Sequence, residues 1–114
     1  MALPTLQRQL AERLLRLFCE KRAPIEHRNQ IRLYYKIRGN SVTLVDSRPG
    51  LLPQDGWLDM SIAQFRYDES EGTWTLYCAD RNNKWYIYMD CDSSKDLSEL
   101  LQEVDDDPTG IFFG

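Results

Sequence analysis

The sequence predicts an α+β fold, with an N-terminal helix, an antiparallel meander sheet of about five strands and a short C-terminal helix. Near both ends of the chain, apolar residues recur at the spacing of one helix face. Between these segments, apolar and polar residues alternate, and short clusters of Gly, Asn, Asp and Pro interrupt the alternation. With 114 residues the chain has the length of one domain, so we expect a single compact domain over residues 1–114.

The N-terminal helix is predicted from about Thr5 to Arg22. Thr5 would cap its first turn, and the pair Ala23 and Pro24 would end it. The polar face is basic and is typical of a solvated helix surface, with a nucleic-acid contact as the alternative. The apolar stripe that supports this prediction comprises Leu6, Leu10, Leu14, Leu17 and Phe18, widened by Leu3, Ala11 and Leu15.

The first two strands are predicted at residues 31–38 and 42–46, joined by a turn at Gly39 and Asn40. Residues 48–56 contain two prolines and two glycines and should form a loop. Residues 57–62 then lead into the strand at Phe65, either as a separate strand or as part of one long bent strand, with Leu58, Met60 and Ile62 on the buried side. The exposed side of the first strand carries Arg32, Tyr34, Lys36 and Arg38.

Residues 65–88 should form three strands, with turns at residues 69–72 and 80–83. Alternation predicts one face for the core and one that is wet but rich in aromatic side chains. The predicted core face carries Phe65, Tyr67, Trp74, Leu76, Cys78, Trp85, Ile87 and Met89. The opposite face would carry Gln64, Arg66, Thr73, Thr75, Tyr77, Lys84, Tyr86 and Tyr88.

The C-terminal helix is predicted from its apolar spacing at Leu97, Leu100, Leu101 and Val104. Ser93 or Ser94 would cap it, and the run from Asp105 to Pro108 would end it. The tail that follows contains Ile111, Phe112 and Phe113. Exposed aromatic residues need a cover, so the tail should either dock on its own core or contact a protein partner or a second copy of the chain.

Composition restricts the class of protein. No apolar run reaches the length of a membrane helix, and charged residues interrupt the N-terminal segment where a signal peptide needs an apolar run. We therefore expect a cytoplasmic protein without membrane contact. Three widely spaced cysteines and one histidine form no zinc pattern, and the acidic clusters lack the spacing of a calcium loop, so no metal or other cofactor is expected.

The net charge of -4 conceals a division along the chain. Residues 1–48 hold ten Lys or Arg against four Asp or Glu, whereas residues 49–114 hold four against fourteen. A basic half can indicate a nucleic-acid or acidic partner. Alternatively, the two halves neutralise each other within the fold or across a dimer.

Function is not specified by any motif. The leading hypothesis is a non-enzymatic binding or protein-interaction module. An alternative is single-stranded nucleic-acid binding through the aromatic and basic sheet face. A second alternative is a small enzyme. A catalytic triad would depend on the single histidine, His27, so the enzyme hypothesis instead uses a polar site built from Arg48, Arg66, Asp80 and Arg81. The candidate ligand-binding residues are Arg48, Arg66, Tyr77, Asp80, Arg81, Tyr86 and Tyr88.

Three segments also carry a family resemblance: GNSVTLVDSRP, FRYDESEGTWTLYCADRNNKWYIY and LSELLQEVDDDPTGIFFG. Together they resemble the small bacterial proteins of the domain of unknown function three-thousand-and-twenty-four family, with the DRN turn and the DPTGIF tail as the most specific parts. The family usually has Trp at the position of Phe113 and often Trp at that of Cys78. The resemblance implies one compact domain and no established activity.

Overall fold

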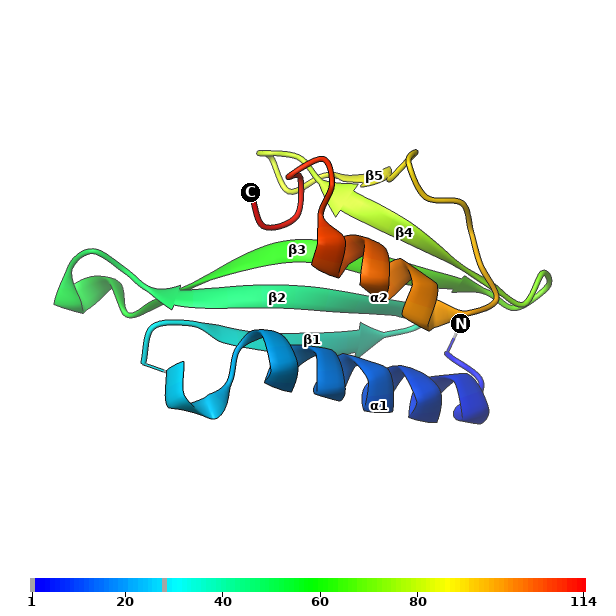
Figure 1. The fold of residues 1–114 in the computed structure, drawn as a ribbon, viewed down its shortest axis with the longest axis horizontal. Coiled ribbons are helices and arrows are strands. Elements are labelled where there is room, and N and C mark those ends of the chain that lie inside the picture. Colours follow the sequence, from blue (N-terminus) through cyan, green and yellow to red (C-terminus); the bar gives the residue numbers. More distant parts are fainter. Residues whose placement is uncertain (1, 28) are drawn as a thin grey trace.

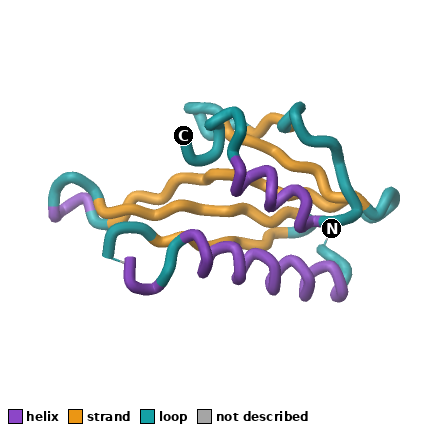
Figure 2. Tube along the Cα trace, viewed as in Figure 1, coloured by secondary structure: helices purple, strands orange, loops and turns teal. Residues whose placement is uncertain are grey.

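The computed structural model describes residues 2–27 and 29–114, and it confirms the α+β fold (Figures 1 and 2). Five strands form one sheet, with a helix before it in the chain and another after it. Short 3-10 turns lie at Ile25–His27 and Pro53–Asp55. The elements are α1 (Thr5–Arg22), β1 (Arg32–Arg38), β2 (Ser41–Pro49), β3 (Trp57–Asp68), β4 (Thr73–Ala79), β5 (Trp85–Ile87) and α2 (Leu97–Asp106).

The sheet is a pure antiparallel meander, with the order β1-β2-β3-β4-β5. Each strand therefore pairs with its neighbour in the chain, which needs only short turns. The β2–β3 pair is the longest and extends well beyond the helices to the turn at residues 50–56 (Figure 1). β2 reaches Pro49, so the predicted loop is shorter than residues 48–56.

Both helices pack on the same face of the sheet. α1 lies against β1 and α2 lies against β4, and the buried residues of both belong to one apolar core (Figure 1). The sheet contributes Val42, Leu44, Phe65, Trp74 and Leu76, each fully buried. By register these side chains share one face, because paired residues of antiparallel strands point to the same side.

The helix termini differ in detail from the prediction. Pro4, not Thr5, occupies the N-cap of α1, and it provides no side-chain cap. Asp96, not Ser93 or Ser94, caps α2 by accepting a hydrogen bond from the Ser98 backbone N–H at 3.0 Å. Serine and aspartate cap about equally well, so composition alone did not choose among these neighbours.

A bulge in β3 corrects a second prediction. The β2–β3 register shifts between Leu44 and Val45, which leaves Ile62 as the extra residue on β3. Ile62 and Ala63 are both buried, but Met60 and Leu58 remain 65% and 57% exposed. They lie on the helix side of the sheet, where the β2–β3 ribbon extends past the helices. The prediction of a buried side was right for Ile62 and wrong for Leu58 and Met60.

The face assignment of β5 was also wrong. Tyr86 pairs with Cys78, and Trp85 pairs with Ala79, so Tyr86 and Tyr88 point to the core side, whereas Trp85 and Ile87 point away from it. Tyr88 is buried, and Ile87 and Met89 are exposed. The length of the turn after β4 sets this register. A shift of one residue would move every side chain of the strand to the other face of the sheet.

The C-terminal tail docks on its own core. Phe112 is buried and packs against Tyr88, with ring centroids 5.0 Å apart, and the Arg22 guanidinium carbon lies 3.7 Å from the centroid of Phe113. Asp107, in left-handed conformation, accepts hydrogen bonds from three backbone N–H groups, those of Phe112, Phe113 and Gly114. Of the two possibilities for the tail, the structure shows docking within the chain.

Candidate binding surface on the open sheet face

The face of the sheet opposite the helices, called here the open face, carries the basic and aromatic side chains predicted for it on β1, β3 and β4. Within residues 2–27 and 29–114, no helix covers it (Figure 1). Register places the following side chains there: Arg32, Tyr34, Lys36, Arg38, Arg66 and Tyr77. Neither of the described α-helices therefore covers these side chains.

Two cross-strand rows form the centre of the open face. Ser41 on β2 pairs with Arg38 on one side and Arg66 on the other. In the next row, Thr43 lies between Lys36 and Gln64 in the same way. Short polar side chains on β2 are thus flanked by longer side chains on β1 and β3, three of them cationic.

Arg66 is held in position rather than freely mobile. Its guanidinium carbon lies 3.9 Å from the centroid of the Tyr77 ring, and its Nε donates a hydrogen bond of 2.6 Å to Gln64 Oε1. Gln64 in turn donates from Nε2 to Thr43 Oγ1 at 2.9 Å. The guanidinium therefore stacks on an aromatic ring, and no ion pair of its NH1 or NH2 groups is found among the described residues.

A second stacked pair lies toward the other end of the open face. The guanidinium carbon of Arg32 lies 3.7 Å from the centroid of the Trp57 ring. Nearby, Tyr34 donates its hydroxyl to Asp59 Oδ2 at 2.9 Å. Partial burial and this bond raise the pKa of Tyr34. Hydrogen bonds from Ser47 and Tyr34 lower the pKa of Asp59, so its carboxylate stays ionised and accepts hydrogen bonds from both hydroxyl groups.

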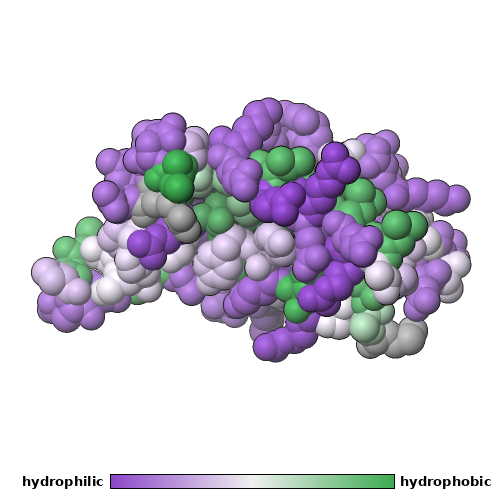
Figure 3. All heavy atoms as spheres, turned by 90° about the horizontal axis from the view of Figure 1, so that it is seen from below, coloured by the Kyte–Doolittle hydropathy of each residue, from purple (hydrophilic) through white to green (hydrophobic). Residues whose placement is uncertain are grey.

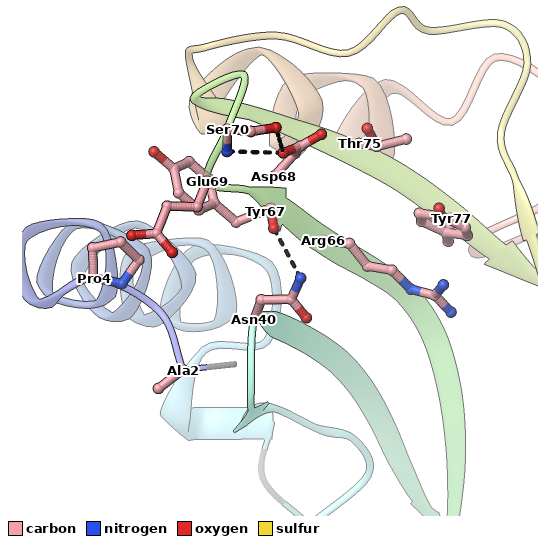
Figure 4. A pocket seen from close by; sticks show the side chains of 10 residues that line it. All are labelled: Ala2, Pro4, Asn40, Arg66, Tyr67, Asp68, Glu69, Ser70, Thr75 and Tyr77. Carbon is pink, nitrogen blue, oxygen red and sulfur yellow. Dashed lines mark hydrogen bonds between the residues drawn. The ribbon is translucent and has the colours of Figure 1, made fainter.

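A hollow of about 430 Å³ borders the open face beside Arg66 (Figure 4). The Arg66 side chain extends along it toward Tyr77, while Asn40, Asp68 and Glu69 surround its other end (Figure 4). The Asp68 carboxylate accepts hydrogen bonds from Ser70 and Glu71 within its own turn, and these bonds lower the pKa of Asp68. The hollow thus combines a stacked guanidinium with polar groups that belong to turns.

The structure does not bring all predicted site residues together. Arg48 lies on the helix side of the sheet, where its Nε donates to Asp46 Oδ1 at 3.2 Å. Arg66 lies on the open face, and Arg81 lies in the β4–β5 turn. Arg48 and Arg66, two of the residues proposed for a polar enzyme site, therefore lie on opposite faces of the sheet. Tyr86 and Tyr88 lie on the helix side and do not contribute to the open face.

Asp80 acts on its own turn. Its Oδ1 accepts hydrogen bonds from the backbone N–H groups of Asn82 and Lys84, at 2.8 and 2.9 Å, and its Oδ2 accepts from the Tyr86 hydroxyl at 3.1 Å. The bonds to the backbone and to Tyr86 lower the pKa of Asp80. The acid of the DRN motif thus holds the hairpin closed, with Asn83 in left-handed conformation.

The basic side chains Arg13 and Arg16 of α1 are exposed. Seen from the side of α1, the molecule is mostly hydrophilic, with apolar side chains in small separate patches (Figure 3). Arg8 pairs with Glu12 on the same helix at 3.7 Å. Of the ion pairs among the described residues, the one between Arg22 and Asp105 joins the basic and acidic parts of the chain. The Arg22–Asp105 pair is therefore a direct contact between a basic side chain of residues 1–48 and an acidic side chain of residues 49–114.

Sequence reasoning missed several residues of the open face. Trp57 and Asp59 were not assigned to it, although strict alternation around Leu58 would have placed them there. Gln64 was placed on the wet face, but its role as the bridge between Arg66 and Thr43 depends on the register of two strand pairs. Register of that kind is not readable from one sequence.

The fold and this surface define a small α+β domain with a five-stranded meander sheet, covered on one face and open on the other. The family model described as Domain of unknown function (DUF3024) matches residues 3–114, and the chain belongs to that family. Comparisons with curated proteins and with solved structures give no match. None of the helices described is long and apolar enough to cross a membrane, and the described residues contain no group of three or more side chains suited to hold a metal ion.

Proposed function

We propose that the protein is a cytoplasmic, non-enzymatic binding module whose ligand lies on the open face, and that this ligand is single-stranded nucleic acid. One observation supports the proposal above the others. A sheet face that no described helix covers carries four cationic side chains, and two of them stack on aromatic rings. The free, unpaired cysteines agree with a reducing compartment.

The arrangement suits a flexible polyanion. Sheet platforms that bind single strands combine cationic groups, which contact phosphates, with flat groups on which bases stack. Here Lys36, Arg38 and Arg66 supply the charges on both sides of the short β2 side chains. Tyr77 and Trp57 supply the planes, each already paired with a guanidinium.

A second copy of the chain fits the same face less well. In a symmetric face-to-face dimer, the cationic surface of one copy would meet the same cationic surface of its partner, and opposed like charges destabilise an interface. A protein partner would need an acidic surface. The enzyme alternative has less support from geometry, because Arg48 and Arg66 point to opposite faces of the sheet.

The test is fluorescence anisotropy with labelled single-stranded oligonucleotides of about 12 nucleotides, a length within the range that small sheet platforms cover. Binding should weaken steeply as salt increases, because phosphate contacts release counterions. Tyr77→Ala should weaken binding by about 1–3 kcal/mol through lost stacking. Lys36→Glu should reduce both the affinity and the salt dependence.

Arg16→Glu is the matched control, because Arg16 is exposed on α1, away from the open face. It should bind as the wild-type protein does. Absence of binding at low salt, or equal losses in Lys36→Glu and Arg16→Glu, would show that the open face is not a nucleic-acid platform. Binding of an acidic protein instead, lost in Lys36→Glu, would redirect the proposal to a protein partner.

A further inference from the structure

Half of β3 has an unpaired edge. β3 spans twelve residues, Trp57–Asp68, and pairs with β2 along its whole length. On its other side, β4 pairs only with Ala63–Asp68, because β4 ends at Ala79 and the chain turns away. Among the described residues, no backbone hydrogen bond joins residues 57–62 to a further strand or loop on that side. An open strand edge is a template for another extended segment.

A groove of about 250 Å³ lies beside this edge. Met60 and Ile62 of β3 line one side, the DRN turn lines another, and Ile111 and Phe112 of the tail complete it. The two most specific motifs of the sequence therefore meet at one groove. Met60 in this groove and Leu58, two residues before it, are more than half exposed and lie on the same side of the strand, and Ile111 of the tail is half exposed in the groove.

The groove has a free positive charge at its rim. Arg81 is exposed, and no hydrogen bond, ion pair or ring contact of its side chain is found among the residues the structure describes. The neighbouring Asp80 forms no ion pair with Arg81 among the described residues, and both of its oxygens accept hydrogen bonds from the turn and from Tyr86. A ligand in the groove would meet apolar surface, open backbone groups and one unpaired guanidinium.

We propose that this edge binds an extended acidic peptide segment, which adds as a strand to residues 57–62 in the position that β4 leaves vacant. Backbone hydrogen bonds to the open edge would supply affinity for an extended chain. Alternate apolar side chains of the peptide would lie on Leu58 and Met60 beside Ile111, and an acidic side chain would pair with Arg81. This site is distinct from the open face and does not depend on the function proposed for it.

A second copy of the chain is a less suitable occupant. Antiparallel pairing of two β3 edges about Met60 would bring the two Arg81 side chains toward each other, because Arg81 lines the groove beside Met60. Pairing about Asp59 would place two carboxylates directly opposite, which is destabilising. An acidic peptide meets the same edge with complementary charge.

The experiment uses a labelled heptapeptide with the sequence Ser-Val-Thr-Val-Thr-Glu-Ser, blocked at both ends, in which both Val and the Glu point to the same side of an extended strand. A second peptide has Lys in place of Glu. The wild-type protein should bind the Glu peptide and bind the Lys peptide at least about fivefold more weakly, as expected for one exposed charge contact. Arg81→Glu should invert this preference. Met60→Glu should weaken binding of the Glu peptide. Arg38→Glu, on the open face, should leave binding of the Glu peptide unchanged.

Hydrogen exchange gives an independent readout. The Glu peptide should slow exchange of backbone amides within residues 57–62 and leave those of β1 unchanged. Absence of binding up to about 1 mM, which corresponds to a very weak complex, would overturn the proposal. So would equal binding by the Arg81→Glu and wild-type proteins. A dimer in light scattering that Met60→Glu dissociates would assign the edge to a second copy and overturn the peptide proposal as well.

Discussion

Two aspartates organise the turns that contain the most specific sequence motifs. Asp80 accepts two backbone N–H groups of its turn, and Asp107 accepts three from the tail. A carboxylate is well suited to this task, because it accepts several hydrogen bonds and these are stronger than bonds between neutral groups. The DRN and DPTGIF motifs therefore specify backbone geometry first, and they shape the groove beside β3 as a consequence.

The pKa of Asp80 predicts how acid affects the turn. Hydrogen bonds lower the folded-state pKa below the ordinary value of 3.8, so the unfolded state binds protons at a higher pH than the folded state. The stability that Asp80 contributes is therefore fully present above that ordinary value and is lost as pH falls through the lower folded-state pKa. Asp80→Asn should reduce this acid dependence, measured by urea denaturation at a series of pH values. An unchanged dependence in Asp80→Asn would exclude this role, and Asp90→Asn, whose side chain is exposed, serves as the control.

At the scale of elements, the helices, β1, β2, β4 and the second half of β3 follow from the sequence, because periodicity is a local property. The positions of Arg66 and Tyr77 on a common face follow in the same way. The facing of β5 and of the first half of β3 does not, because one depends on the length of a turn and the other on a bulge. One extra residue at Ile62 and the length of the turn after Ala79 set which side chains face the core. The open edge of β3 also depends on where β4 ends, which the sequence did not reveal.

Substitutions on β5 test its register. Tyr88→Ala should destabilise the protein by about 3 kcal/mol or more, because Tyr88 is buried against Phe112 and donates its hydroxyl to Glu103 at 2.9 Å. Ile87→Ala should cost about 1 kcal/mol or less, because Ile87 is 51% exposed. Thermal and chemical denaturation would measure both values. A larger cost for Ile87→Ala than for Tyr88→Ala would mean that the strand has the opposite facing.

At the scale of the whole molecule, Arg22 connects the N-terminal helix with the C-terminal helix and the tail. Its NH1 donates to Asp105 Oδ1 at 2.8 Å and to the Asp105 backbone carbonyl at 3.1 Å. Its guanidinium also stacks on Phe113. One side chain at the end of α1 thus connects this helix with α2 and the tail, across the helix side of the sheet.

Arg22→Ala should therefore destabilise the protein by about 1–3 kcal/mol, because it removes hydrogen bonds to a charged group and a stacked ring together. Arg22→Lys should recover only part of the loss, since an ammonium group cannot form the planar stack. Arg16→Ala, at an exposed position of the same helix, should change the free energy of unfolding by less than about 0.5 kcal/mol. Equal effects of the Arg22 and Arg16 variants would show that the connection contributes no stability.

The meander order has a kinetic consequence. Every strand pairs with its neighbour in the chain, so the sheet can form through short loop closures, whereas the Arg22–Asp105 contact spans 83 residues. We expect the closure of α1 onto α2 and the tail to form after the rate-limiting step. Arg22→Ala should then accelerate unfolding in stopped-flow experiments and leave the refolding rate nearly unchanged. A slower refolding rate would instead place this closure in the folding nucleus.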